Sequence, residues 1–140
     1  MAMMGLPPAE SSLTLQEQLP ATVASVAAAR RAVLRYAADL EVDVDGMVLA
    51  VSEAVANAVT HAYDDGAEGV IELSMSATPY EVTVHVRDHG RGLAAAERGT
   101  SHRGYGIEII RRLAQHVTLD SADGVALTMR FRRGGAWSAR

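Results

Sequence analysis

Apolar residues recur along the first half of the chain with two periods, and each period predicts a different kind of element. Alternation over 13–19 predicts a half-buried strand, and spacings of three and four predict helices over 20–40 and 47–63. Pro20 suits the first turn of a helix, where its missing N–H has no partner to lose, and residues 43–46 punctuate the two helices. The apolar sides are expected to be Val23, Val26, Ala27, Val33, Leu34 and Ala37 in the first helix, and Val48, Val51, Val55, Val59 and Ala62 in the second.

The second half of the chain predicts two hairpins separated by one helix. Short alternating runs, joined by turn residues, indicate strands that pair with their neighbours in sequence. The expected strands are 70–75, 82–86, 117–120 and 125–131, and the expected helix is 107–116. This order of elements predicts an α+β two-layer sandwich, with a mixed, mostly antiparallel sheet and helices on one face.

Length and composition indicate one globular domain of 140 residues, with 49% hydrophobic and 21% charged residues. We expect a disordered arm over 1–12, a domain over 13–132 and a flexible tail over 133–140. The chain has no cysteine, which excludes disulfides, thiolate nucleophiles and cysteine-bound zinc. All 13 basic residues are arginine, so a lysine-containing phosphate loop and a Schiff base are also excluded.

Charge and hydropathy further narrow the class of protein. A net charge of −4 argues against a nucleic-acid or anionic-membrane binder, because such proteins need a basic surface. No apolar stretch reaches the roughly 18 residues of a membrane span, and the first residues lack a signal-peptide pattern. We therefore expect a cytoplasmic protein.

Three clusters could carry chemistry. Glu53, Asn57 and His61 stand four residues apart, so they share one face of the second helix. That face is either the solvated side of the helix, or it places a base, Glu53, and an oxygen ligand, Asn57, beside small alanines. The segments 88–92 and 104–106, which read DHGRG and GYG, contain glycines at alternate positions. They are either ordinary turns or backbone that approaches a ligand closely, with the start of the third helix as a binding site for phosphate.

The order and spacing of these clusters resemble those of one superfamily. Residues 49–63, which read LAVSEAVANAVTHAY, resemble the N box of the GHKL superfamily of ATP-binding proteins. Segments 88–92 and 104–106 are similar to its two glycine boxes. The wording of the N box resembles the bacterial anti-sigma-factor serine/threonine kinases of partner-switching systems, and the resemblance extends over 13–131. It implies an ATP-binding two-layer sandwich of the Bergerat type.

The resemblance implies a role for each motif residue, with ATP and Mg²⁺ as cofactors. Asn57 is the implied Mg²⁺ ligand and Glu53 the general base. Asp88 is implied to bind the adenine amine, with Gly90 and Gly92 shaping the base pocket. Further residues implied to contact nucleotide are His61, Arg98, Arg103, Gly104, Tyr105 and Gly106. Of these, the arginines belong to a lid over 93–103, for which an exposed loop is the alternative, and His61 has a structural role as its alternative.

The implied activity is ATP-dependent phosphorylation of a STAS-type anti-anti-sigma partner by a homodimer that also sequesters a sigma factor, with Arg30 or Arg31 helping to meet the partner. The alternatives are an ATP-binding module that transfers no phosphate and, less favoured, a histidine-kinase fragment. Two features depart from the family's pattern. The lid is short, and Gly124 is followed by Val125 and Ala126 where many members have Gly-Thr-Thr.

Overall fold

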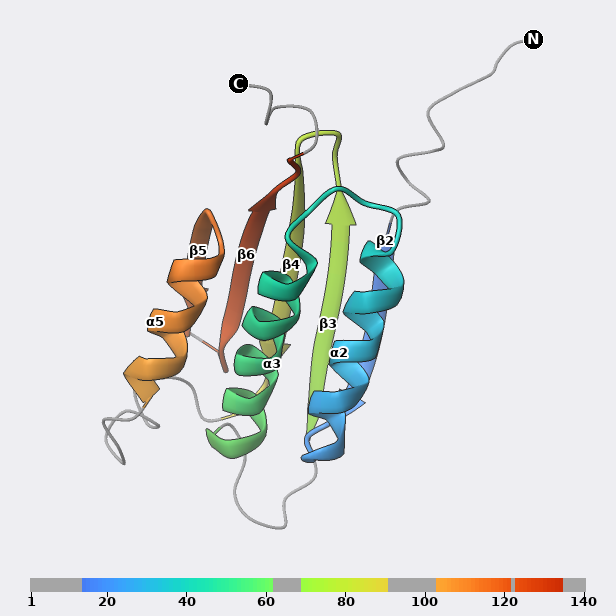
Figure 1. Ribbon diagram of the computed structural model, residues 1–140. Helices are drawn as coiled ribbons and strands as arrows, with labels where there is room; N and C mark the ends of the chain where they lie inside the picture. Colours follow the sequence, from blue (N-terminus) through green and yellow to red (C-terminus); the bar gives the residue numbers. More distant parts are fainter. Residues whose placement is uncertain (1–13, 62–68, 91–102, 122, 135–140) are drawn as a thin grey trace, which may run out of the picture.

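A computed structural model describes residues 14–61, 69–90, 103–121 and 123–134 (Figure 1). The elements, in chain order, are β2 (Thr14–Pro20), α2 (Ala24–Ala37), α3 (Val44–His61), β3 (Val70–Ala77), β4 (Glu81–Asp88), α5 (Arg103–Leu113), β5 (His116–Asp120) and β6 (Ala126–Arg132). The predicted α+β class and both hairpins are therefore confirmed. The predicted arm over 1–12 and the end of the second helix at Tyr63 lie outside the described residues.

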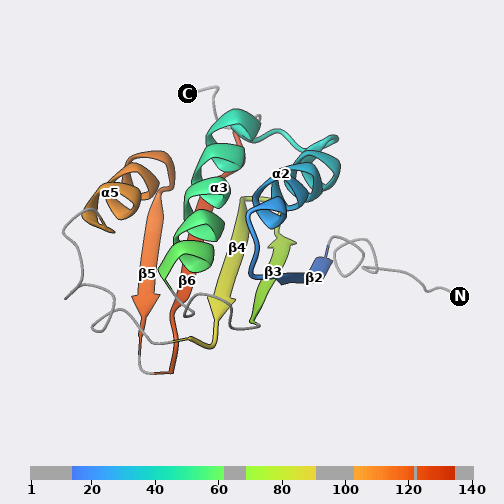
Figure 2. The ribbon, with the colours of Figure 1, turned by 90° about the horizontal axis from the view of Figure 1, so that it is seen from below.

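The five described strands form one sheet in the order β2-β3-β4-β6-β5, with β4 in the middle. Each neighbouring pair among these strands is antiparallel, so the sheet expected to be mixed and mostly antiparallel is antiparallel throughout its described strands. The three helices lie side by side over one face, with α3 packed between α2 and α5 (Figures 1 and 2). The result is the two-layer sandwich that the order of elements predicted.

The core lies between the helices and the covered face of the sheet. Alternate residues of β3 and β4 point into it, in agreement with their period of two. Large, fully buried members of this core include Met47, Val51, Val55, Ile71, Leu73, Val84, Ile110, Met129 and Phe131. The other face of the sheet carries polar side chains such as Ser74, Thr83 and Thr128, which a solvated face tolerates.

The prediction for the first helix was wrong in two respects. Pro20 is the last residue of the edge strand β2, opposite Val70, and not a helix residue. Proline is tolerated at that edge because no further strand needs its missing N–H. The buried side of α2 consists of Ser25, Ala29, Ala32, Val33 and Ala37, whereas Val23 and Leu34, which were expected inside, are 78% and 50% exposed, and Ala27 is also exposed.

The second helix begins at Val44, three residues earlier than predicted, because Asp43 caps it. The Asp43 carboxylate accepts a hydrogen bond from the Gly46 N–H at 3.0 Å, and its carbonyl accepts the first helical bond from Met47 at 3.0 Å. Residues 43–46, which were predicted to separate the two helices, therefore form the N-cap and the first turn of α3.

Replacing this cap is expected to destabilise the domain. Asp43→Ala leaves an N–H of the first turn without its side-chain acceptor, so the free energy of unfolding should fall by about 1 kcal/mol in urea denaturation. The matched control is Asp39→Ala, which removes an exposed carboxylate just beyond α2. Equal stabilities of the two variants would contradict the capping role.

Two further boundaries differ from the predicted ones. Helix α5 spans Arg103–Leu113, so Gly104 and Gly106 lie within its first turns and His116 belongs to β5. The ordered chain also extends into the predicted tail, because Arg133 donates to the Tyr80 carbonyl and Gly134 to the Glu41 carbonyl, both at 2.8 Å.

Candidate functional site

The face of α3 that carries the polar cluster lies beside the core. Glu53, Asn57 and His61 are all half-buried, while Ala54 and Ala58 between them are buried. The four-residue spacing places the three polar side chains along one side of the helix. The three side chains are therefore partly shielded from solvent.

The first turns of α5 approach this face at Asn57. Gly106 is buried, and a Cβ atom added to it would lie 2.7 Å from Nδ2 and 3.2 Å from Oδ1 of Asn57. A side chain at position 106 would displace the Asn57 amide from its present position, so glycine allows α5 to pack closely against it. The structure thus brings together two residues that are 49 positions apart in sequence, one from the N-box segment and one from the second glycine segment.

Asp88 is the last residue of the central strand β4, and it is only 4% exposed. Its Oδ1 atom accepts hydrogen bonds from the Gly90 N–H at 2.9 Å and the Val125 N–H at 3.2 Å. Burial of a carboxylate costs several kcal/mol unless such donors compensate for lost water. Among the described residues, Oδ2 receives no hydrogen bond, so this oxygen is the one available to a ligand.

Gly124 lies directly against Asp88, a contact that its expected place in the turn before the last strand did not indicate. Its φ is +79°, and an added Cβ atom would lie 2.2 Å from the Asp88 carbonyl oxygen. The next residue, Val125, receives the Asp88 N–H on its carbonyl at 2.9 Å. Residues 124 and 125 therefore fix both the backbone and the carboxylate of Asp88. A glycine in a turn is a weak signal, because the sequence does not show which segment it approaches.

The remaining predicted site residues are only partly described. Gly90 follows β4 and orients Asp88 through its N–H, whereas Gly92 and Arg98 lie outside the described residues. The backbone of Arg103, Gly104 and Tyr105 forms the start of α5.

The ends of three elements define the position of the candidate site. The C-terminal end of α3, the end of β4 and the start of α5 lie at the same end of the molecule (Figure 1). The start of an α-helix offers unpaired N–H groups that favour anions, and Asp88 offers an acceptor for an amine. The described residues contain no group of three or more histidine, aspartate or glutamate side chains able to hold a metal ion alone.

These features define a class: a two-layer α+β domain with a buried strand-end carboxylate and a glycine-bearing helix start at one end of the sheet. Residues 19–131 match the model of the histidine kinase-like ATPase domain, and the chain belongs to this ATP-binding family. None of the helices in the described ranges has the length and hydropathy needed to cross a membrane.

Two relatives of this chain are anti-sigma F factors. The anti-sigma F factor of Bacillus subtilis (strain 168) is 27% identical over 118 residues, which cover 75% of this chain and 81% of the relative. The anti-sigma F factor of Clostridium botulinum (strain Eklund 17B / Type B) is 37% identical over 68 residues, covering 46% of this chain and 48% of the relative. The chain is thus an anti-sigma F factor-like member of the family.

A solved structure has the same fold. The crystal structure of the RsbU and RsbW domains of Rv1364c from Mycobacterium tuberculosis superimposes with a TM-score of 0.68 at 22% identity. The match covers 87% of this chain and 33% of that chain.

Proposed function

We propose that this chain is an ATP-dependent serine/threonine protein kinase that acts as an anti-sigma factor. It phosphorylates a STAS-type anti-anti-sigma partner and sequesters a sigma factor, as a homodimer in the cytoplasm, through a domain over 13–132. The observation that carries the proposal is the close packing of Gly106 against Asn57, one helical turn from the half-buried Glu53. It is supported by the family match and by the anti-sigma F factor relatives.

Adenine recognition is assigned to Asp88. Its Oδ1 atom is held by two backbone N–H groups, which leaves Oδ2 to accept the exocyclic amine of adenine. Gly90 and Gly92 keep side chains out of the base pocket. The backbone N–H of Val125 donates to the Asp88 carboxylate. Val125 therefore positions Asp88 in the segment where many family members have Gly-Thr-Thr.

Phosphate and metal binding are assigned to the α3 and α5 segments. Asn57 would supply an oxygen ligand to Mg²⁺, and the unpaired N–H groups at the start of α5, that of Gly104 among them, would bind phosphate oxygens. Gly106 would contact the nucleotide region by letting α5 approach Asn57 closely. When bound, Mg²⁺ neutralises the negative charge that builds up on the phosphate oxygens. Nucleotide contacts from His61, Tyr105, Arg98 and Arg103 complete this proposed set. No lysine is needed for it.

Glu53 is assigned as the general base. It lies one turn before Asn57 on the same side of α3, where it can accept the proton of the attacking serine or threonine hydroxyl. Partial burial favours this role because it limits competition from water.

The test is a transfer assay. The purified protein is incubated with γ-labelled ATP, Mg²⁺ and each STAS-domain protein encoded beside its gene, with and without EDTA. The expected result is label on one partner, only in the presence of Mg²⁺. ATP binding without label on any partner would support a non-catalytic ATP-binding module, and lack of ATP binding would overturn the nucleotide site.

Asp88→Asn is expected to weaken ATP binding by about a hundredfold, measured by titration calorimetry. The amide can still accept from the Gly90 and Val125 N–H groups with its oxygen, but it then presents a donor to the adenine amine. GTP binding should not weaken in parallel, because GTP has no amine at that position. The control Asp39→Asn removes an exposed charge outside the site, and unchanged ATP affinity in Asp88→Asn would contradict the assignment.

A further inference from the structure

A second surface feature lies at the opposite end of the sheet from the nucleotide site. It is a groove of about 730 Å³ where the β3–β4 turn meets the start of β5 and the end of β6, and its polar lining includes Tyr80, Glu81, Gln115, His116, Arg132 and Arg133. Strand β4 begins here at Glu81 and ends at Asp88. Seven residue steps along a strand span roughly 23 Å, so a ligand in this groove does not touch the nucleotide.

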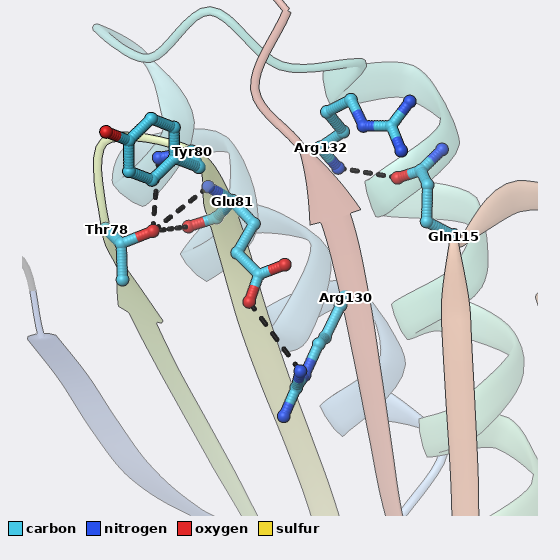
Figure 3. Close-up of polar contacts among 6 residues, drawn as sticks. All are labelled: Thr78, Tyr80, Glu81, Gln115, Arg130 and Arg132. Carbon is cyan, nitrogen blue, oxygen red and sulfur yellow. Dashed lines mark hydrogen bonds and ion pairs between the residues drawn. The ribbon is translucent and has the colours of Figure 1, made fainter.

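One wall of the groove is a turn held in a single conformation. The Thr78 hydroxyl accepts hydrogen bonds from the N–H groups of Tyr80 at 3.1 Å and Glu81 at 3.2 Å, as Figure 3 shows. The Thr78 N–H also donates to the Glu81 carbonyl at 2.9 Å. This fixed turn presents the Tyr80 side chain to solvent, with 78% of the residue exposed. A large aromatic ring on a rigid support loses little entropy on binding, so it is a suitable anchor for a partner.

The opposite wall is tied to the turn and to β5. Arg133 donates from its N–H to the Tyr80 carbonyl at 2.8 Å and from Nη1 to the Thr78 carbonyl at 2.7 Å. Burial raises the pKa of Tyr36 on α2, and the positive charge of Arg133 opposes that rise. The Gln115 side-chain oxygen accepts from the Arg132 N–H (Figure 3). Arg133 therefore has a structural role, and the groove is preformed.

Arg132 differs from its neighbours in its charge environment. The single carboxylate in the lining, Glu81, is 3.8 Å from the guanidinium of Arg130, which offsets its charge. Within the described ranges Arg132 takes part in no ion pair, and its backbone is fixed by Gln115. With His116 and Arg133 beside it, Arg132 makes this groove a locally positive surface on a chain with a net charge of −4.

We propose that the groove docks an acidic peptide segment of a protein partner, with a carboxylate on Arg132 and an apolar side chain against Tyr80. A guanidinium binds carboxylate through paired N–H donors, and exposed tyrosine next to arginine is typical of the residues that dominate protein–protein binding energy. A guanidinium without an ion-pair partner in the described ranges can hold one carboxylate, but it does not form the extended basic surface that a nucleic-acid backbone requires. The docking surface is separate from the nucleotide site, so its occupancy does not depend on the proposed kinase activity.

The test uses the full chain and a fluorescein-labelled model peptide, Gly-Glu-Asp-Leu-Glu-Asp-Phe-Asp-Glu-Gly, in a fluorescence-anisotropy titration at low salt. Binding is expected to weaken as salt is added, and a peptide with lysine at each acidic position should not bind. Arg132→Glu and Tyr80→Ala should each weaken binding by about tenfold or more. Arg111→Glu makes the same charge change at an exposed position of α5. Its affinity for the peptide should stay within about twofold of that of the unaltered chain.

Several results would overturn the proposal. They are no binding at about millimolar peptide, equal losses in Arg132→Glu and Arg111→Glu, or tighter binding of a single-stranded DNA oligomer that displaces the peptide. A thermal melt of each variant separates loss of folding from loss of docking. ATP titration of the same variants should give unchanged affinity, so that failure of docking and failure of the nucleotide site are distinguishable.

Discussion

Replacing Glu53 with glutamine is expected to slow phosphoryl transfer to the STAS-domain partner by about three orders of magnitude. Glutamine has nearly the same shape, but it cannot accept the proton that leaves the attacking hydroxyl. ATP affinity should change by about twofold or less, because the proposed nucleotide contacts come from other residues. A loss confined to the transfer rate distinguishes a base from a residue that merely binds substrate.

The measurement is single-turnover transfer from γ-labelled ATP, with ATP binding followed separately by calorimetry. The matched control is Glu41→Gln, an exposed residue in the connection between α2 and α3. That connection lies at the opposite end of the molecule from the end of β4 (Figure 1). Equal transfer rates in Glu53→Gln and Glu41→Gln would remove Glu53 from the base role. A parallel loss of ATP affinity would instead make Glu53 a binding residue.

The sequence predicted strands better than helix faces, for a physical reason. A strand buried on one face needs strict alternation, and β3 and β4 show it plainly, with Ile71 and Val84 inside. Helix α2 carries alanine on its buried side and on its exposed side, so apolar residues alone do not mark the side that packs. The side of α2 that packs on the core is the side whose small side chains allow close contact, such as Ala29 and Ala32 at 0% exposure. Leu34 remains half exposed. Side-chain size, which a pattern of apolar residues ignores, decided the orientation.

The candidate site was predictable where its residues belong to continuous motifs. The spacing of Glu53 and Asn57 follows from helix geometry alone, and glycine at 106 was interpreted as part of a helix start open to phosphate. The packing of Gly106 against Asn57 could not be deduced from spacing. The same limit applies to Val125, which bonds the carboxylate of Asp88 from 37 residues away because β6 pairs with β4. Contacts between distant segments depend on the order of strands in the sheet. The hydrophobic pattern of each segment does not reveal that order.

Gly124→Ala is expected to be the most destabilising of the substitutions considered, because the structure has no space for a methyl group. The φ of +79° is strained for alanine, and its Cβ would overlap the Asp88 carbonyl oxygen at 2.2 Å. The backbone must shift to relieve this overlap, which breaks the Val125 hydrogen bonds with Asp88. The free energy of unfolding should fall by about 3 kcal/mol.

The same shift moves the carboxylate that is proposed to bind adenine, so ATP affinity should fall by about tenfold even where the variant is fully folded. Guanidinium denaturation and ATP calorimetry at low temperature measure the two effects separately. The control is Asp123→Ala, an exposed change at the preceding residue, which should alter stability by about 0.5 kcal/mol or less. Stability and ATP affinity both equal to those of Asp123→Ala would show that the close approach of Gly124 to Asp88 does not shape the site. Lower stability with unchanged affinity would show that this turn stabilises the fold but is not needed for adenine binding. In that case the Gly90 N–H alone would suffice to position Asp88.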